Sequence, residues 1–170
     1  MRALSRAAAV GTAAGVVLAG AAPVPPSPAA AAGCRVPPTH RIAQVQGSGP
    51  ATPLAGRTVR VAGVVTADLQ EDDRLRGFFI QDPVPDDDPA TSEGLFVYAG
   101  TALRDVRAGD RVLVTGRAVE FHGWTQLSPV HAVDVCGTGT ITPLRHPLPR
   151  RPGATFEPVE NMLLTVPGPL

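Results

Sequence analysis

The sequence predicts an all-β fold, a small Greek-key barrel of five strands, within residues 57–137. Three observations lead to this prediction. Five segments rich in β-branched, aliphatic and aromatic residues follow one another over about 80 residues, a composition typical of strands. Two long segments, two short ones and a closing long one fit the unequal strands of a small barrel. Glycine, proline and polar clusters separate the segments, and only one interval has room for a small helix or turn.

The first strand is expected at Arg57–Asp68, where valines alternate with polar residues. Gly63 interrupts this alternation, and Gly116 interrupts the fourth strand in the same way. A glycine inside a strand often marks a bulge or a bend. We therefore expect both glycines to bend their strands.

The remaining strands are expected at Gly77–Asp82, Gly94–Tyr98, Asp110–Phe121 and Thr125–Cys136. The acidic, proline-bearing stretch Pro85–Glu93 is expected to be a surface loop. Leu103–Gly109 is too short for a full helix, so we expect a turn or a short 3₁₀ segment there. Phe121–Trp124 is expected to form a hairpin in which Gly123 supplies the turn conformation. The five-stranded barrel of this size is typically the OB-fold, which binds single-stranded nucleic acid or sugars.

The first 32 residues are expected to be a secretory signal peptide. Two arginines, Arg2 and Arg6, precede an apolar run at Ala7–Ala22, and the small residues Ala29–Ala32 offer cleavage sites. A transmembrane anchor is the alternative, but the run has about 16 residues and a spanning helix needs roughly 20. We therefore expect a secreted, extracellular protein without stable membrane association after cleavage.

The rest of the chain divides by composition. Residues 33–56 form an N-terminal extension in which His40–Val45 is expected to be a short strand or a turn of helix. Residues 138–158 are rich in proline and are expected to be a semi-rigid linker. Residues 159–170 contain the apolar run Asn161–Val166, which either completes the barrel or begins a truncated following segment. We favour the second interpretation, because a lone strand has no partner.

The charge of the mature chain argues against strong non-specific binding to DNA. All 15 basic residues are arginine, and two of them lie in the signal peptide. The mature chain therefore carries 13 arginines against 15 acidic residues, a net charge of −2. Sequence-independent binding to nucleic acid depends on excess positive charge.

The only two cysteines, Cys34 and Cys136, predict a disulfide in an exported chain. The bond would tie the mature N-terminus to the end of the fifth strand. Two free thiols are one alternative. Lipidation of Cys34 is another, because Ala31–Cys34 resembles a lipoprotein cleavage box.

The candidate binding residues lie on one face of the predicted barrel. Side chains alternate along a strand, so one choice of register places the core residues Phe78, Ile80, Leu95 and Val97 inside and leaves the other rings outside. The outer face of the second and third strands, and the loops beside it, hold the candidate nucleic-acid-binding residues Arg74, Arg76, Phe79, Gln81, Phe96, Tyr98, His122 and Trp124. Exposed rings are typical of single-strand binders, in which bases stack on them. The alternative is that these rings fill a small core.

No catalytic residue, cofactor or metal site is expected. The four histidines (His40, His122, His131 and His146) do not have the spacing of a zinc site. The acidic runs Glu71–Asp73 and Asp86–Asp88 could bind Ca²⁺, but neither has EF-hand spacing and solvated loop charge is the favoured interpretation. We also expect no carboxylate pair in an apolar setting that would raise a pKa for acid–base chemistry.

An ordered series of segments carries a family resemblance: Ile42–Gly47, Gly63–Thr66, Gly77–Pro83, Asp88–Tyr98, Gly109–Gly116, Thr125–Ser128, Val135–Gly137 and Glu157–Val166. Together they resemble the OB-like domain that precedes the catalytic domain of secreted bacterial nucleases of the ExeM/NucH type, in the endonuclease/exonuclease/phosphatase superfamily. The resemblance implies the same fold, export, the Cys34–Cys136 bond and a role facing nucleic acid.

The resemblance also implies what this chain lacks. In that family a later domain supplies the metal ligands and cleaves the phosphodiester, so a divalent metal is expected only there. We expect a non-catalytic, monomeric accessory domain whose partners are single- or double-stranded DNA and a catalytic nuclease domain. One alternative is a structural module that packs against that domain through Met162–Val166. The other, a free-standing enzyme, is not favoured.

Overall fold

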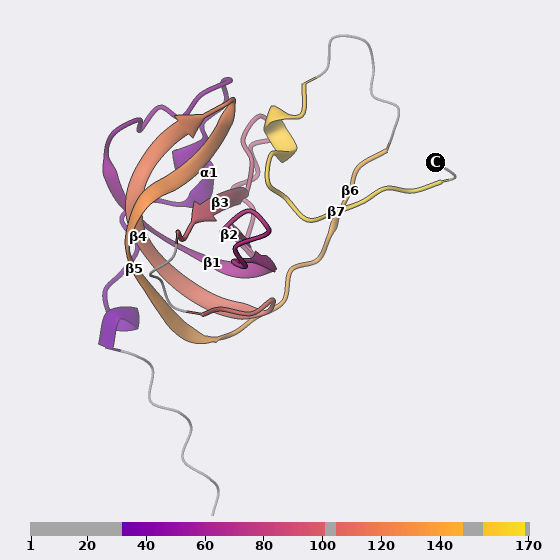
Figure 1. The fold of residues 1–170 in the computed structure, drawn as a ribbon. Coiled ribbons are helices and arrows are strands. Elements are labelled where there is room, and N and C mark those ends of the chain that lie inside the picture. The colour runs from indigo at the N-terminus through magenta and orange to yellow at the C-terminus, as the bar shows by residue number, and fades with distance from the viewer. Residues whose placement is uncertain (1–31, 101–104, 148–154, 169–170) are drawn as a thin grey trace, which may run out of the picture.

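The structure, a computed structural model, describes residues 32–100, 105–147 and 155–168 (Figure 1). Nearly all of the predicted signal peptide, part of the connector before the fourth strand and part of the predicted linker therefore lie outside the described residues. The described chain is mostly strand, with one short α-helix and two 3₁₀ turns, η1 (Ala32–Arg35) and η2 (Glu157–Val159). The prediction of an all-β fold is confirmed.

Five strands form a closed barrel in the order β1-β2-β3-β5-β4, and β4 pairs back with β1. The strands are β1 (Thr58–Leu69), β2 (Gly77–Gln81), β3 (Gly94–Tyr98), β4 (Asp110–Phe121) and β5 (Trp124–Thr138). Neighbours run antiparallel except β3 and β5, which are parallel. The long strand β1 pairs with β4 through its first half and with β2 through its second. All five strands occur where the sequence predicts them.

The two glycines predicted to bend their strands behave differently. The pairing of β4 with β5 shifts on both sides of Gly116, so a bulge there is confirmed. The pairing of β1 is regular at Gly63 and shifts between Val65 and Ala67 instead, so no bulge occurs at Gly63. A Cβ at Gly63 would lie 3.2 Å from Cδ1 of Ile42. The absence of a side chain therefore lets the helix region approach the strand closely.

The predicted register of the short strands is confirmed. Alternate residues of β2 and β3 point into the barrel and are fully buried: Phe78, Ile80, Leu95 and Val97. Valines of β1 and β4 and Leu127 of β5 join them in one continuous core. Burial of this apolar surface is the main favourable contribution to folding, about 25 cal/mol per Å².

The short helix α1 (Ile42–Gln46) packs against the barrel core (Figure 1). Ile42 and Val45 are fully buried in the core cluster. The helix is favoured over a strand because Oε1 of Gln44 accepts a hydrogen bond of 2.9 Å from the backbone N–H of Arg41, which satisfies one free donor of the first turn. Of the two structures expected for this stretch, the turn of helix is the one observed.

A disulfide joins Cys34 in η1 to Cys136 in β5, across a sequence separation of 102 residues. The predicted bond is confirmed. In the chain-entropy model a loop of this length stabilises the folded state by up to about 4–5 kcal/mol. Disulfides persist in oxidising compartments, so the bond is consistent with an extracellular environment. None of the helices in the described ranges has the length and apolar character needed to cross a bilayer.

The chain continues beyond the barrel as two adjacent stretches. The parallel pair β6 (Leu144–Arg145) and β7 (Leu164–Thr165) joins them, and Figure 1 shows this pair beside the barrel rather than within it. The expectation that Asn161–Val166 is a strand without a partner is therefore wrong. Its partner comes from the stretch that composition predicted to be a linker.

Residues 157–163, which we call the C-terminal clasp, dock on the barrel beside β3 and β5. Val159 is buried, and Oγ of Ser92 donates a hydrogen bond to the backbone carbonyl of Glu160. At Gly94 a Cβ would lie 2.3 Å from the carbonyl carbon of Asn161. Only glycine at this position permits such a close approach of the two backbones.

Candidate functional site

Three aromatic rings cluster on the outer face of the barrel, where β2, β3 and β5 meet. The ring centroid of Phe79 lies 4.9 Å from that of Phe96, and the centroid of Trp124 lies 6.4 Å from the first and 6.2 Å from the second. The rings are tilted or edge-on to one another, as aromatic pairs prefer. The cluster therefore lies on the outside of the barrel rather than in its core.

Backbone pairing explains how the rings come together. Phe79 and Phe96 are directly opposite each other in the antiparallel pair of β2 and β3. Trp124 is delivered by the hairpin between β4 and β5, in which His122 and Gly123 both have positive φ, 53° and 79°. Two successive positive φ angles are those of the tight turn that matches strand twist. The predicted hairpin is confirmed.

The rings on this face differ in exposure. Tyr98 is 37% exposed and Phe79 is half-buried, but Phe96 is only 4% exposed. Phe96 points away from the core, yet its ring lies over Gly77, where a Cβ would be 2.5 Å from it. The outer-face register is therefore right, but Phe96 supports its neighbours rather than offering a ring for stacking.

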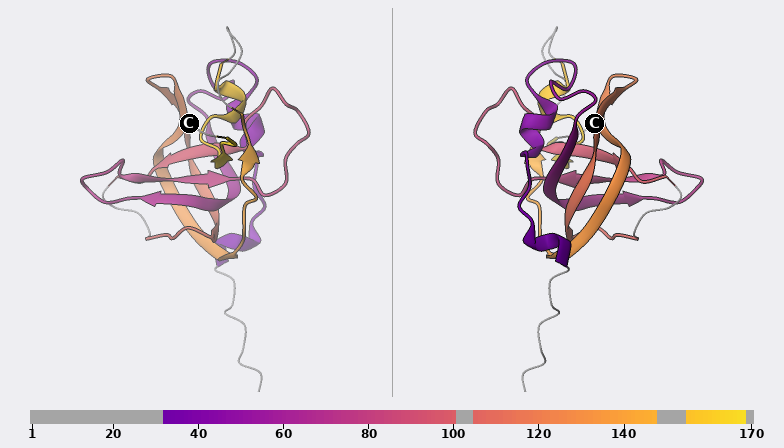
Figure 2. Two further views of the ribbon diagram at one scale, coloured as in Figure 1. Left: turned by 90° about the vertical axis from the view of Figure 1, so that its right-hand side faces the viewer. Right: turned by 90° about the vertical axis from the view of Figure 1, so that its left-hand side faces the viewer.

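A pocket of about 370 Å³ lies beside this cluster. Its side chains come from the β1–β2 loop, from β3, from the β4–β5 hairpin and from β5, and most are apolar or aromatic: Leu75, Phe96, Tyr98, Phe121, Trp124, Gln126 and Ser128. Figure 2 shows the β1–β2 loop and the β4–β5 hairpin projecting from the same side of the barrel. We call this site the aromatic pocket.

Sequence reasoning missed four of the pocket residues. Leu75 and Phe121 are 43% and 58% exposed, unusual values for large apolar side chains. Gln126 and Ser128 alternate with Trp124 along β5, so strand periodicity could have placed them on its face. The predicted residue His122 packs edge-on against Phe121 with a centroid distance of 4.3 Å and does not line the pocket.

The two predicted arginines lie in the β1–β2 loop and are paired with acidic residues of the same loop. Nε of Arg74 is 2.5 Å from Oε2 of Glu71, and Nε of Arg76 is 3.5 Å from Oδ1 of Asp72. All four side chains are substantially exposed, and such pairs contribute about 0–1 kcal/mol each. The loop therefore holds two cations near the pocket while compensating most of their charge.

Gln81 does not belong to the binding surface. It is 5% exposed, and its Oε1 accepts a hydrogen bond of 2.8 Å from the backbone N–H of Leu163 in the C-terminal clasp. The prediction that it contacts nucleic acid is wrong, because the clasp covers this end of the face. Its observed contact holds the clasp on the barrel.

Glu160 of the clasp is a half-buried carboxylate near β5. Burial raises its pKa above the usual 4.5, although a hydrogen bond from the backbone of Thr125 opposes the rise, and the nearby carboxylates of Glu157 and Glu120 raise the pKa further. Oε1 of Glu120 is buried and has no hydrogen-bond partner among the described residues. We expected no carboxylate pair in a setting that raises a pKa, but here burial and neighbouring carboxylates together raise the pKa of Glu160.

Glu93, just before β3, behaves similarly. Burial raises the pKa of its carboxyl, and the neighbouring carboxylates of Asp86 and Asp82 add to the effect, while a hydrogen bond from the backbone of Asp86 opposes it. Neither this glutamate nor Glu160 lines the aromatic pocket. Their raised pKa values therefore concern stability and loop structure.

The acidic loop between β2 and β3 is held by its own carboxylates. Oδ1 of Asp86 accepts hydrogen bonds from the backbone N–H of Asp88 and from Oγ1 of Thr91, and Oδ1 of Asp88 accepts one from the backbone N–H of Ala90. The first of these bonds lowers the pKa of Asp86. Within the described ranges, no group of three histidine, cysteine or acidic side chains is arranged to hold a metal ion.

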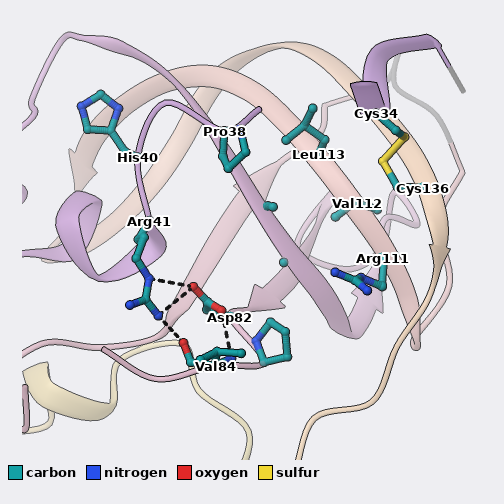
Figure 3. A pocket seen from close by; sticks show the side chains of 13 residues that line it. Cys34, Pro38, His40, Arg41, Asp82, Val84, Arg111, Val112, Leu113 and Cys136 are labelled. Carbon is teal, nitrogen blue, oxygen red and sulfur yellow. Dashed lines mark hydrogen bonds and ion pairs between the residues drawn. A yellow bond between two sulfur atoms is a disulfide. The ribbon is translucent and has the colours of Figure 1, made fainter. Parts of the chain in front are cut away.

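A second pocket, of about 510 Å³, lies between the N-terminal extension and the outer surface of β1 and β4 (Figure 3). At its edge, Nη2 of Arg41 lies 3.3 Å from Oδ2 of Asp82. Arg111 and the disulfide line the other side. Because Arg41 is already paired with an acid, this pocket does not gather charge of one sign.

Neither family models nor curated proteins show a match to this sequence. The candidate site is therefore defined by its geometry: exposed rings around a pocket, flanked by a loop with two arginines.

Proposed function

We propose that this chain is a non-catalytic, exported binding domain of the OB-fold type that holds single-stranded nucleic acid in the aromatic pocket. The observation that carries the proposal is the group of exposed rings between the β1–β2 loop and the β4–β5 hairpin. Five-stranded OB-folds bind oligonucleotides and oligosaccharides on the face of strands 2 and 3 between the corresponding loops.

Stacking explains why a chain without excess positive charge could bind nucleic acid. Each base stacked on a ring contributes about 1–3 kcal/mol in single-strand binders, largely independently of sequence. Trp124 and Phe121 offer exposed ring surface, 44% and 58%, and Tyr98 adds a third ring. The faces of bases inside a duplex are already stacked, so these rings favour single strands.

The role of the domain would be to hold or steer a strand rather than to cleave it. In the nuclease family that the sequence resembles, cleavage and its divalent metal belong to a separate catalytic domain. An accessory domain that stacks unpaired bases would present the backbone of the strand to that domain. Arg74 and Arg76 lie on either side of Leu75, which lines the pocket. Their guanidinium groups would leave their exposed acidic partners and bind the phosphates of the strand instead.

A second candidate function is a structural module that packs against a catalytic domain. The pairing of both loop arginines with acids favours it, because the surface around the pocket then carries little net charge. An exposed apolar patch also fits a protein partner.

Fluorescence anisotropy with labelled oligonucleotides tests the leading proposal. The wild-type chain should bind a single strand of six to eight nucleotides more tightly than a duplex of the same length. Trp124→Ala should weaken single-strand binding roughly 5- to 150-fold. Phe156→Ala is the matched control, because this ring is also exposed but does not line the aromatic pocket.

Circular dichroism of both variants establishes that they are folded. No binding by the wild-type chain at high micromolar concentration would refute the proposal, as would equal losses in the two variants. If the wild-type chain binds a purified catalytic nuclease domain but does not bind DNA, the second candidate function, a structural module, is favoured.

A further inference from the structure

Gln126 is the most buried polar side chain of the aromatic pocket. Gln126 is 7% exposed, and its side-chain amide makes no hydrogen bond with any residue that the structure describes. The amide atoms nevertheless keep some contact with solvent. In the described ranges, the only completely buried side-chain oxygen or nitrogen atoms without a hydrogen-bond partner are Oε2 of Glu93 and Oε1 of Glu120. The Gln126 side chain lines the aromatic pocket, so the pocket is where its amide reaches solvent.

The strand pairing fixes where this amide lies. Gln126 is paired with Phe96 in the short parallel ladder of β3 and β5, and it shares its face of β5 with Trp124 and Ser128. The amide therefore lies at the floor of the pocket, beside the covered ring of Phe96. The more exposed rings of Tyr98 and Trp124 stand on either side along the strands.

A primary amide in such a place is chemically specific. It presents a carbonyl oxygen as acceptor and an NH₂ group as donor in one plane. A buried polar group without a partner is unfavourable, whereas the same group paired with a ligand is not. Flat apolar walls above a planar donor–acceptor pair fit a flat heterocycle whose edge carries an adjacent donor and acceptor.

We propose that Gln126 reads the edge of one unpaired nucleobase in the aromatic pocket and gives the domain a preference for adenine; this inference rests on the function proposed above. On its N6/N7 edge adenine presents an NH₂ donor beside a ring-nitrogen acceptor, whereas the corresponding edges of cytosine and thymine carry only a donor or only an acceptor, and glutamine forms a two-bond pair with the adenine edge. Gln126 thus selects the base, while the rings of Tyr98 and Trp124 hold it by stacking. Gln126 is a specificity-determining residue, and the remaining affinity is independent of sequence.

The test compares the affinities of hexamers of dA, dC and dT for three proteins. The wild-type chain should bind dA more tightly than dT, roughly 5- to 100-fold. Gln126→Met keeps the size of the side chain but removes both polar groups, so it should bring the two affinities together, chiefly by weakening dA binding. Ser128→Ala removes a hydroxyl group from the same pocket and should keep a dA-to-dT ratio close to that of the wild type.

A second variant guards against a packing defect. Gln126→Glu offers only acceptors when ionised, so it loses the bond to N7 of adenine and should bind dA more weakly. It should favour dC instead, because the exocyclic NH₂ group of cytosine can donate a hydrogen bond to the carboxylate. If the wild-type chain binds all three oligonucleotides and Gln126→Met has the same ratio of dA to dT affinity as the wild type, the role of Gln126 is overturned while the proposed function stands. Absence of binding to any hexamer by the wild-type chain would overturn this inference together with the proposed function.

Discussion

The backbone N–H of Thr125 donates a hydrogen bond of 2.9 Å to Oε1 of Glu160, 35 residues further along the chain. The hydroxyl of the same threonine donates one of 3.0 Å to Oε2 of Glu120. Two carboxylates thus meet at one residue at the start of β5, next to Trp124 of the aromatic pocket. The C-terminal clasp therefore stabilises the strand that carries the candidate site.

This contact predicts that Glu160→Gln weakens the pH dependence of stability. Burial raises the pKa of Glu160 in the folded state above 4.5, so the folded state favours the protonated carboxyl. Its contribution to stability is present below about pH 4.5 and is lost as pH rises through the raised pKa. Glutamine keeps the acceptor oxygen but cannot ionise, so the melting temperature of the variant should fall less between pH 4.5 and 8.

Thermal unfolding followed by circular dichroism across this range measures the effect. Asp73→Asn, which removes an exposed carboxylate from the β1–β2 loop, should leave the wild-type profile unchanged. If the melting temperatures of the wild type and of Glu160→Gln change with pH by the same amount, this carboxyl ionises alike in the folded and unfolded states, which would contradict the prediction. Fluorescence of Trp124, the only tryptophan of the chain, reports locally on the same contact.

Gly94→Ala should detach the C-terminal clasp. The added Cβ would lie 2.3 Å from the backbone of Asn161 and cannot be accommodated without movement of one segment. We expect a loss of about 1–3 kcal/mol, as for overpacking elsewhere, together with faster hydrogen exchange at the backbone N–H of Leu163. Gly49→Ala is the matched control, because a Cβ there meets no atom within 4 Å. Unchanged protection of Leu163 in Gly94→Ala would contradict the close approach.

The sequence was sufficient to predict the barrel because strand alternation is a local property. Phe78 and Ile80 alternate with polar or outward residues, and short strands of this kind have one register that buries them. The bulge at Gly116 was also predictable, because the glycine that marks it lies within the strand itself. The role of Gly63 was not predictable from its strand, because it depends on the approach of Ile42 from outside the strand.

The site was less predictable because its exposure depends on contacts between distant residues. Phe96 is covered because Gly77 on the neighbouring strand leaves room for its ring. Gln81 is covered by Leu163, 82 residues away, which nothing in either segment indicates. The acidic partners of Arg74 and Arg76 depend on the conformation of the β1–β2 loop, so the order of charges along the sequence does not predict which ion pairs form.

The disulfide should stabilise the barrel against unfolding by denaturant. Replacing both Cys34 and Cys136 with serine removes the constraint on a loop of more than 100 residues. The chain-entropy model gives a loss of up to about 4–5 kcal/mol in the free energy of unfolding. Urea titration of the variant and of the wild type, with and without reductant, measures it. Equal midpoints for the oxidised wild type and the double variant would contradict the expectation.

The last prediction concerns the charge of the β1–β2 loop. Glu71→Gln with Asp72→Asn removes the two acids that pair with Arg74 and Arg76. Both guanidinium groups then become available to phosphates, so single-strand affinity should rise at low salt. Two added phosphate contacts should also steepen the slope of log K against log salt by about 1.4, since each contributes roughly 0.7 on single strands.

Anisotropy titrations between 50 and 200 mM salt measure both effects. The matched control is Asp87→Asn with Asp88→Asn, which removes the same number of charges from the β2–β3 loop on the opposite side of the barrel (Figure 2). A general effect of net charge would change both double variants alike, because it acts at any surface position. If single-strand affinity rises equally in the two double variants, or does not rise in Glu71→Gln with Asp72→Asn, the bound nucleic acid does not contact Arg74 and Arg76. It would then also lie away from the aromatic pocket beside them.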